Sequence, residues 1–198
     1  MVNTHPKLEK TLVLVKPDGV FRGLVGEVIA RFEKRGLKIA ALKMVWPTRQ
    51  HVYKHYPEDA AWFTNIGSRT HKFFQEHHVD IKEHFGTEDH LKIGQKVKTW
   101  LGDYMIQGPV VAMVVQGMHA ITTVRKLVGP TYPVEALPGT IRGDFSVDTP
   151  TAANVEGRVV KNIIHASGDP KEAKHEISHW FTAKEIHQYK RSDEDTMF

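Results

Sequence analysis

A histidine and a glutamate near the C-terminal end of the chain could form a nucleophilic site. Residues 161–168 read KNIIHASG, in which two β-branched isoleucines favour a buried strand that ends near His165. The small residues after His165 predict a loop that leaves space in front of the ring. Glu176 follows in an expected helix, where it could hold one ring nitrogen and leave the other free as a nucleophile. The alternative is a strand that merely ends in a polar residue, and it must be weighed because the chain has 13 histidines.

Cationic side chains beside turns could bind a polyphosphate. Lys16 ends an expected strand and precedes a turn into a helix, where its ammonium group and the backbone could meet a phosphate. The stretch lacks the GxxxxGK[ST] pattern, so it is not a P-loop. Arg125 and Arg142 flank a loop rich in glycine and proline, and with the Thr131 hydroxyl they could clamp phosphates. The alternative is that both arginines are merely solvated surface residues. It is excluded only if the cationic side chains and His165 lie close together in the folded protein.

The pattern of apolar residues predicts strands and helices in alternation. Continuous apolar runs predict buried strands, and apolar residues three and four apart predict helices. Without the additional helices the order is βαββαβ, which predicts an α+β fold: a ferredoxin-like sandwich with a four-stranded antiparallel sheet and helices on one face. The expected strands are 11–16, 37–46, 110–115 and 159–165; the expected helices are 24–34, 48–56, 97–105, 119–127, 170–179 and 183–189; and 128–145 is expected to be an ordered loop.

Two segments depart from this alternation. We expect one domain, 1–198, with a helical insertion at about 57–95 and a smaller excursion at about 146–158. The ends of the first segment flank Tyr56 and Val97, so it is expected to fold over the rim of a cleft or along a subunit edge. Its phenylalanines require apolar cover.

Several histidines in and around the first segment could bind a metal ion. A solvated surface is the favoured interpretation, because their spacing matches no familiar ligand set and the chain has no cysteine. The histidines are His71, His77, His78, His84 and His90, together with the helical pairs His51/His55 and His175/His179.

Composition narrows the classes of function. The formal net charge is +4 and the sequence pI is about 9.2, which favours anionic partners such as nucleotides or nucleic acids. The absence of cysteine excludes disulfides, thiolate catalysis and zinc–thiolate sites. The longest apolar run, 110–115, is too short to span a bilayer, and the first ten residues have no apolar signal segment. We therefore expect a soluble, cytoplasmic protein without a membrane partner.

Several stretches together resemble a nucleoside diphosphate kinase. They occur in the family's order and cover most of the chain outside 57–95 and 146–158. The resemblance implies that the γ-phosphate of a nucleoside triphosphate, typically ATP, is transferred to a nucleoside diphosphate by a ping-pong mechanism through a phosphohistidine at His165. The stretches are KPDGVFRGLVGEVIARFEKRGLKI, HY at 55–56, GPVVAMVVQG, PGTIRGDFS and NIIHAS.

The same resemblance implies roles for individual residues. Glu176 would orient the His165 ring, and Ser167 would bond to this glutamate. Val97 and Leu101 lie where the family stacks the base between apolar side chains, which implies broad nucleotide specificity. Mg²⁺ is implied as a cofactor that is held mainly by the nucleotide phosphates rather than by protein ligands. The implied phosphate and sugar contacts are Lys16 (also counted as catalytic), Tyr56, Arg125, Thr131, Arg142 and Asn162.

Three positions depart from the family pattern. Ala166 replaces a frequent glycine, Gly168 replaces the usual aspartate, and Val97 replaces an aromatic residue beside the base. The resemblance also implies a homo-oligomer, with a hexamer favoured and a tetramer as the alternative; the 128–143 loop would help to join dimers.

Two other classes of function were weighed. A nucleic-acid-binding module would fit the basic charge, but the RNP1 aromatic pattern is absent, so nucleic acid is not an expected partner. A pseudo-enzyme that only binds nucleotide is disfavoured by the joint presence of the expected nucleophile, its glutamate and three cations.

Overall fold

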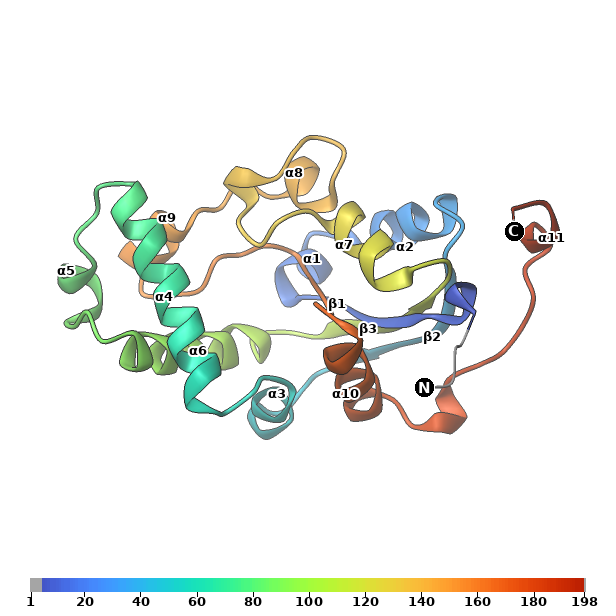
Figure 1. Ribbon diagram of the computed structural model, residues 1–198, viewed down its shortest axis with the longest axis horizontal. Coiled ribbons are helices and arrows are strands. Elements are labelled where there is room, and N and C mark those ends of the chain that lie inside the picture. Colours follow the sequence, from blue (N-terminus) through green and yellow to red (C-terminus); the bar gives the residue numbers. More distant parts are fainter. Residues whose placement is uncertain (1–4, 198) are drawn as a thin grey trace.

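The computed structural model describes residues 5–197, and its centre is a four-stranded sheet with the order β2-β3-β1-β4 (Figure 1). β1 (Lys10–Val15) pairs antiparallel with β3 (Val110–Gln116) and with β4 (Ile164–Ala166). β2 (Lys38–Val45) pairs antiparallel with β3. This order and these directions confirm the ferredoxin-like sandwich.

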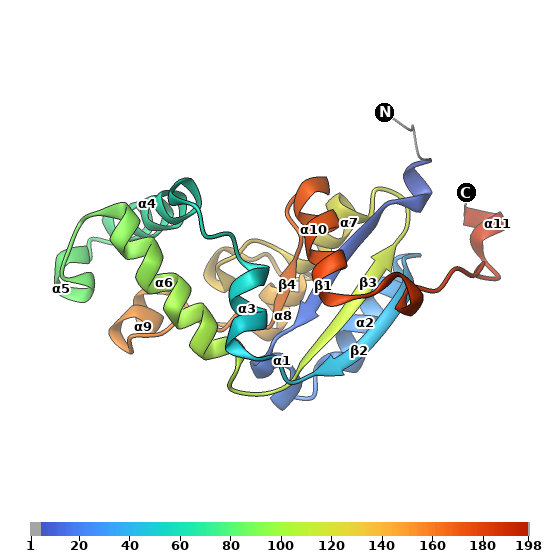
Figure 2. The same cartoon turned by 90° about the horizontal axis from the view of Figure 1, so that it is seen from below.

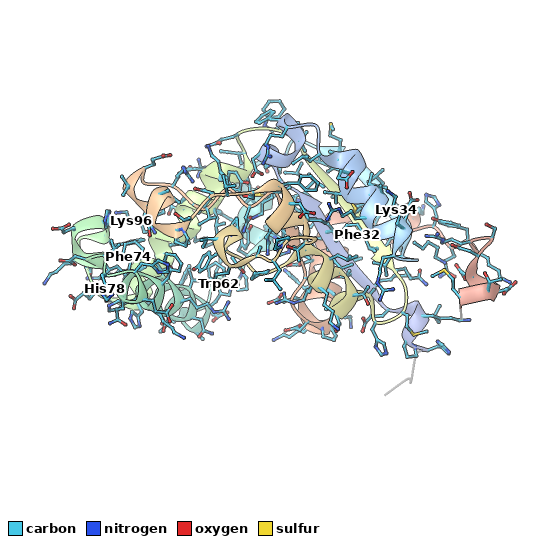
Figure 3. The ribbon with its side chains drawn as sticks, turned by 90° about the horizontal axis from the view of Figure 1, so that it is seen from above. Phe32, Lys34, Trp62, Phe74, His78 and Lys96 are labelled. Atoms are coloured by element: carbon cyan, nitrogen blue, oxygen red, sulfur yellow. The ribbon has the colours of Figure 1, made fainter. Side chains whose placement is uncertain are left out.

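Helices cover both faces of the sheet, so the expectation of one covered face is wrong. α2 (Val25–Lys34) and α7 (Ala120–Val128) lie on one face, and α3 (Arg49–His55) and α10 (Pro170–Trp180) lie on the other (Figure 1). The reason is that β1 and β3 are apolar and buried at consecutive positions, so side chains on both of their faces need cover. Figure 3 shows Phe32 of α2 over the sheet, where it is fully buried.

Local signals account for the helices that border the candidate site. Gly36, in the left-handed region at φ 83°, follows the end of α2. Thr48 caps α3 by accepting from the amide of His51 at 3.2 Å. Asp169 caps α10 by accepting from the amides of Lys171 and Glu172 at 2.7 and 2.8 Å. Thr48 and Asp169 therefore set where α3 and α10 begin. α1 (Pro17–Phe21) follows β1 directly.

Three elements near the C-terminal half differ from the sequence prediction. β4 occupies Ile164–Ala166 rather than 159–165, because Ile163 has φ 67° and a left-handed residue cannot continue a strand. The expected loop 128–145 contains α8 (Ile141–Phe145), which Thr140 caps by accepting from the amide of Gly143 at 3.1 Å. The last expected helix is only the short turn η3 (Ala183–Glu185). The remaining short elements are η1 (Pro6–Leu8), η2 (Pro133–Glu135) and α11 (Glu194–Met197).

A helical unit formed by α4 (Ala60–Glu76), α5 (Ile81–Phe85) and α6 (His90–Met105) projects from one end of the sheet (Figures 1 and 2). It has an apolar cluster of its own, and Figure 3 shows Phe74 far from Phe32 of the main core. α6 begins before the expected residue 97, because Asp89 accepts from the amide of Leu91 at 2.9 Å and caps the helix. The clustered residues are Phe73, Phe74, Ile81, Phe85 and Ile93.

One domain with an insertion at about 57–95 and an excursion at about 146–158 stays a prediction. The limit at residue 95 falls inside α6, which continues to Met105. The second segment contains α9 (Pro150–Val155), which contacts α4. No helix within residues 5–197 is long and apolar enough to cross a membrane.

We predict that Gly94→Ala destabilises the helical unit. A Cβ at Gly94 would overlap the carbonyl of Phe63, because α4 and α6 cross there with their backbones in contact. The free energy of unfolding, measured in urea, should fall by about 1–3 kcal/mol. Gly26→Ala is the matched control: no atom lies within 4 Å of the added methyl group, so helix propensity should raise stability by up to about 1 kcal/mol. A Gly94→Ala protein as stable as the Gly26→Ala protein would contradict this packing.

Candidate active site

His165 lies in the middle of β4, opposite Leu14 of β1. Its Nε2 lies 2.9 and 3.0 Å from the two carboxylate oxygens of Glu176, which α10 brings over the strand. The Ser167 hydroxyl donates to the same carboxylate at 2.6 Å. A carboxylate accepts only, so the proton of the neutral imidazole lies on Nε2 and the lone pair lies on Nδ1. The side chain of His165 is 18% exposed, against 7% for Glu176, so solvent reaches the histidine rather than its partner.

A tight turn precedes His165. The amide of Ile164 donates to the carbonyl of Asn162 at 2.7 Å across Ile163, which is the hydrogen bond of a γ-turn. The carbonyl of Ile163 accepts from the amide of Lys16 at 2.7 Å. The amide of Ile163 donates to the carboxylate of Asp18 at 3.0 Å. The other carboxylate oxygen of Asp18 accepts from the Tyr104 hydroxyl. Lys16, which follows β1, and side chains of α1 and α6 therefore hold a backbone conformation that a β-branched residue rarely adopts.

Lys16 is buried at the start of α1. Its ammonium group donates to the side-chain oxygen of Asn162 at 2.7 Å and lies 5.5 Å from the centre of the Tyr104 ring. Burial, followed by the positive charge of Arg142, lowers the pKa of Lys16 to about 7, although Asp18 opposes the shift. Lys16 is therefore a cation whose charge changes near neutral pH.

Arg142 is buried as well, and the backbone surrounds its guanidinium group. It donates to the carbonyls of Gly129 and Pro130 at 2.9 and 2.8 Å, and to that of Ile164 at 2.6 Å. A fourth bond, of 3.3 Å, goes to the carbonyl of Asn162. Burial, and then the charge of Arg125, lowers the pKa of Arg142 to about 10, so this group keeps its charge at neutral pH.

Thr131 and Arg125 complete the cationic side of the site. The side-chain amide of Asn162 donates to the carbonyl of Thr131 at 2.8 Å, which places Thr131 beside Lys16 and Arg142. Arg125, on α7, is exposed and lines a groove of about 510 Å³ that Gly129 and Gly168 also line. A Cβ at Gly168 would lie 3.5 Å from the guanidinium of Arg125, so this position bears on the groove directly.

Tyr56 and two apolar residues of α6 pack against the apolar cluster on the sheet face that α3 and α10 cover. Burial, with a further contribution from the charge of Glu176, raises the pKa of Tyr56 well above its usual value. Val97 and Leu101 are half-buried, and both pack against the apolar cluster below the sheet. Trp62 of α4 lies with its ring centre 6.0 Å from that of Tyr56, an aromatic neighbour that sequence reasoning did not single out.

His55 is the residue near the site that sequence reasoning placed wrongly. It was expected on a solvated helix face, but it is 2% exposed and its Nε2 lies 3.7 Å from Glu176. The spacing of four residues between His51 and His55 does not indicate a shared environment. The ring of His51 stacks on that of His179, with centroids 4.0 Å apart. Contacts between α3 and α10, far apart in the sequence, decide the environment of His55.

Comparisons with known proteins agree with this architecture. Residues 9–79 and 68–186 match the family described as nucleoside diphosphate kinase. A nucleoside diphosphate kinase of Pyrobaculum aerophilum is 50% identical over 179 residues, which cover 90% of this chain and 98% of that protein. One of Archaeoglobus fulgidus is 43% identical over 191 residues, which cover 96% of this chain and 98% of that protein.

Solved structures agree as well. The crystal structure of an NDP kinase from Pyrobaculum aerophilum superposes with a TM-score of 0.88 at 48% identity, and covers 91% of this chain and 100% of that chain. A structure from Borrelia burgdorferi, described as a transition-state mimic of nucleoside-diphosphate kinase with bound vanadate and ADP, superposes with a TM-score of 0.78 at 38% identity and covers 97% of this chain and 98% of that chain. The sequence match and the shared fold extend over most of the chain, which therefore belongs to the nucleoside diphosphate kinase family.

Proposed function

We propose that this chain transfers the γ-phosphate of a nucleoside triphosphate, typically ATP, to a nucleoside diphosphate, with Nδ1 of His165 as the phosphoryl carrier. The observation that supports this role is the bond of 2.9 Å between Nε2 of His165 and Glu176, since it leaves the lone pair of Nδ1 free. Lys16 and Arg142 both donate to Asn162, which lies in the turn before β4.

The reaction proceeds in two half-reactions. In the first, Nδ1 of His165 attacks the γ-phosphorus, the bond from this phosphorus to the β,γ-bridging oxygen breaks, and the nucleoside diphosphate leaves. The imidazole becomes positive when it takes up the phosphoryl group. The carboxylate of Glu176, held by Ser167 at 2.6 Å, stabilises that charge at the other nitrogen. In the second, a terminal phosphate oxygen of another nucleoside diphosphate attacks the phosphohistidine and restores the neutral ring.

Three cations neutralise the moving phosphoryl group in this proposal. Arg142 is held by backbone carbonyls, so its charge is in position before the substrate arrives. Lys16, which binds Asn162, and Arg125, whose charge acts on Arg142, supply further positive charge. Phosphoryl transfer depends mainly on such positioning and charge neutralisation.

The remaining contacts hold the nucleoside. Tyr56, Asn162 and the Thr131 hydroxyl contact the phosphates and sugar, while Val97 and Leu101 offer apolar surface to the base. Apolar contact does not read the hydrogen-bonding edge of a base, which accounts for broad nucleotide specificity.

Mg²⁺ is proposed to enter with the nucleotide. Both carboxylate oxygens of Asp18, an acid whose charge acts on Lys16, accept hydrogen bonds from Tyr104 and from the amide of Ile163. The other carboxylate of the site, Glu176, binds His165 and Ser167. With these carboxylates already hydrogen-bonded, the nucleotide phosphates would be the principal ligands of Mg²⁺, which would supply positive charge to them. A homo-oligomer, with a hexamer favoured and a tetramer as the alternative, and a cytoplasmic location stay predictions.

His165→Ala should abolish labelling of the protein by γ-labelled ATP and the exchange of phosphate between nucleotides. The variant should keep its fold, because alanine retains the backbone pairing of β4 with β1 and the partly exposed ring is not part of either apolar core of the sheet. Acid-labile, base-stable label measures phosphohistidine. His175→Ala removes an exposed histidine on the adjacent helix and serves as the control. Label on the His165→Ala protein equal to that on the control would contradict the proposal.

Glu176→Gln should slow turnover by about 10²-fold without preventing nucleotide binding. A glutamine keeps an acceptor near Nε2 of His165 but loses the negative charge that stabilises the phosphorylated ring. Steady-state kinetics and ADP binding measured on the same protein separate the two effects. Loss of ADP binding in a folded Glu176→Gln protein would show that Glu176 has a different role.

Nucleotide affinity should weaken with rising pH because of Lys16. Its ammonium group is charged below its pKa of about 7 and progressively neutral above it. Between about pH 7.5 and about pH 9.5, where nucleotide phosphates no longer titrate, the Kd for ADP should rise by up to about tenfold per pH unit. Lys16→Arg keeps its charge and should give a flat profile. A wild-type profile as flat as that of Lys16→Arg would show that the ammonium group does not titrate in this range.

A further inference from the structure

His55 presents an unpaired polar atom to the proposed catalytic carboxylate. It is the last residue of α3, a helix that lies beside α10 (Figure 1). The side chain of His55 is completely buried. Nε2 of His55 has no hydrogen-bond partner among the described residues and lies 3.7 Å from the nearer oxygen of Glu176. A buried polar atom without a partner is costly, so its persistence calls for a physical reason.

Trp180 determines which nitrogen of His55 carries the proton. The indole N–H of Trp180 donates to Nδ1 of His55 at 3.2 Å, so Nδ1 must present its lone pair. Burial, and then the neighbouring positive groups, lowers the pKa of His55 well below its usual value and keeps the ring neutral. The proton of a neutral ring then lies on Nε2 and points toward Glu176. The charged or titratable groups around it are Lys16 after β1, Tyr56 after α3, His165 on β4, and His175, Glu176 and His179 on α10.

This tautomer excludes a metal-binding role for the cluster as it stands. One nitrogen each of His55 and His165 and one oxygen of Glu176 lie within 4.8 Å of one another, a spacing that a transition metal could bridge. A metal would need the lone pair of Nε2 of His55, yet this nitrogen carries the proton. The hydrogen bond from Trp180 therefore favours a donor over a ligand.

We propose that His55 is a positioning residue for phosphoryl transfer, which donates its Nε2–H to Glu176 as the His165 ring becomes charged. A shift of less than about 1 Å would convert the contact into a hydrogen bond. The His55 ring also packs edge-on against the His165 ring, with centroids 4.7 Å apart at 83°, so it limits rotation of the nucleophile. A neutral donor aligns the carboxylate and leaves its negative charge available to the His165 ring. A lysine or an arginine in this place would partly neutralise that charge. The inference rests on the proposed role of His165.

The test compares two substitutions, one of which keeps the ring and the other the donor. His55→Phe keeps an aromatic ring but has no donor, whereas His55→Gln keeps an N–H near the position of Nε2. Both remove Nδ1, the acceptor of the Trp180 indole N–H. Because His55→Phe keeps the ring and His55→Gln loses it, slower phosphorylation in His55→Phe than in His55→Gln cannot come from lost ring packing and reports loss of the donor to Glu176. Val52→Ala, at a fully buried position of the same helix, controls for loss of stability.

The first measurement is the single-turnover rate of His165 phosphorylation by γ-labelled ATP, together with the Kd for ADP. His55→Phe should slow phosphorylation by about tenfold with an unchanged Kd, and His55→Gln should stay within about threefold of the wild type. Val52→Ala should keep the wild-type rate at a lower melting temperature. Equal rates in His55→Phe and the wild type would overturn the inference. Absence of label on wild-type His165 would instead refute the proposed function.

The second measurement reads the tautomer directly. Ring nitrogen shifts of ¹⁵N-histidine-labelled protein should show His55 as the neutral form with its proton on Nε2 from about pH 6 to about pH 8. A proton on Nδ1, or inhibition by Zn²⁺ that His55→Phe removes, would overturn the donor role and assign His55 to a metal site.

Discussion

The left-handed turn at Ile163 is the constraint on which the candidate site depends. A β-branched residue in this conformation costs about 1–3 kcal/mol, so the surrounding structure must stabilise it. The side chain of Ile163 is fully buried in the core above the sheet. Its carbonyl binds the amide of Lys16, and its amide binds the carboxylate of Asp18. Because the turn ends one residue before His165 in the strand, the contacts that stabilise the turn also set where the imidazole lies, and they hold the backbone of Lys16 against Ile163.

The charges around this turn are held in two different ways. Arg142 donates to four backbone carbonyls, which offset the cost of burying its guanidinium group and keep it in one place. Lys16 has one side-chain acceptor, Asn162, and burial brings its pKa to about 7. The site therefore combines a permanent cation, fixed by the backbone, with one whose charge responds to pH and to an arriving phosphate. An anion beside Lys16 would raise its pKa again, so binding of a nucleotide and protonation of Lys16 favour each other.

The sequence allowed prediction of those features whose causes are local or lie along one element. The spacing of apolar residues located α2, and Thr48 located the start of α3. A histidine expected in a strand and a glutamate expected in the next helix predicted the pair of His165 and Glu176 that the structure brings together. The short β4 could not be predicted in this way, because contacts from α1 and α6 impose the conformation of Ile163. The burial of His55 escaped prediction for the same reason: Trp180 and Glu176, more than a hundred residues away, create its environment. The apolar run of β1 did indicate helices on both faces of the sheet. Consecutive apolar residues point to opposite faces of a strand, and all residues of β1 except the first are buried.

α6 connects the projecting helical unit to the turn at Ile163. At one end Ile93 packs in the cluster of α4 and α5, and at the other end the Tyr104 hydroxyl donates to Asp18. A helix of 16 residues is a rod of about 24 Å, so a change in how α6 packs against α4 moves Tyr104 with it. The crossing at Gly94, where no side chain separates the backbones of α6 and α4, fixes the position of this rod along its neighbour. Segment 57–95 is thus linked mechanically to the backbone that presents His165, even though none of the hydrogen bonds to His165 or Glu176 described above comes from it.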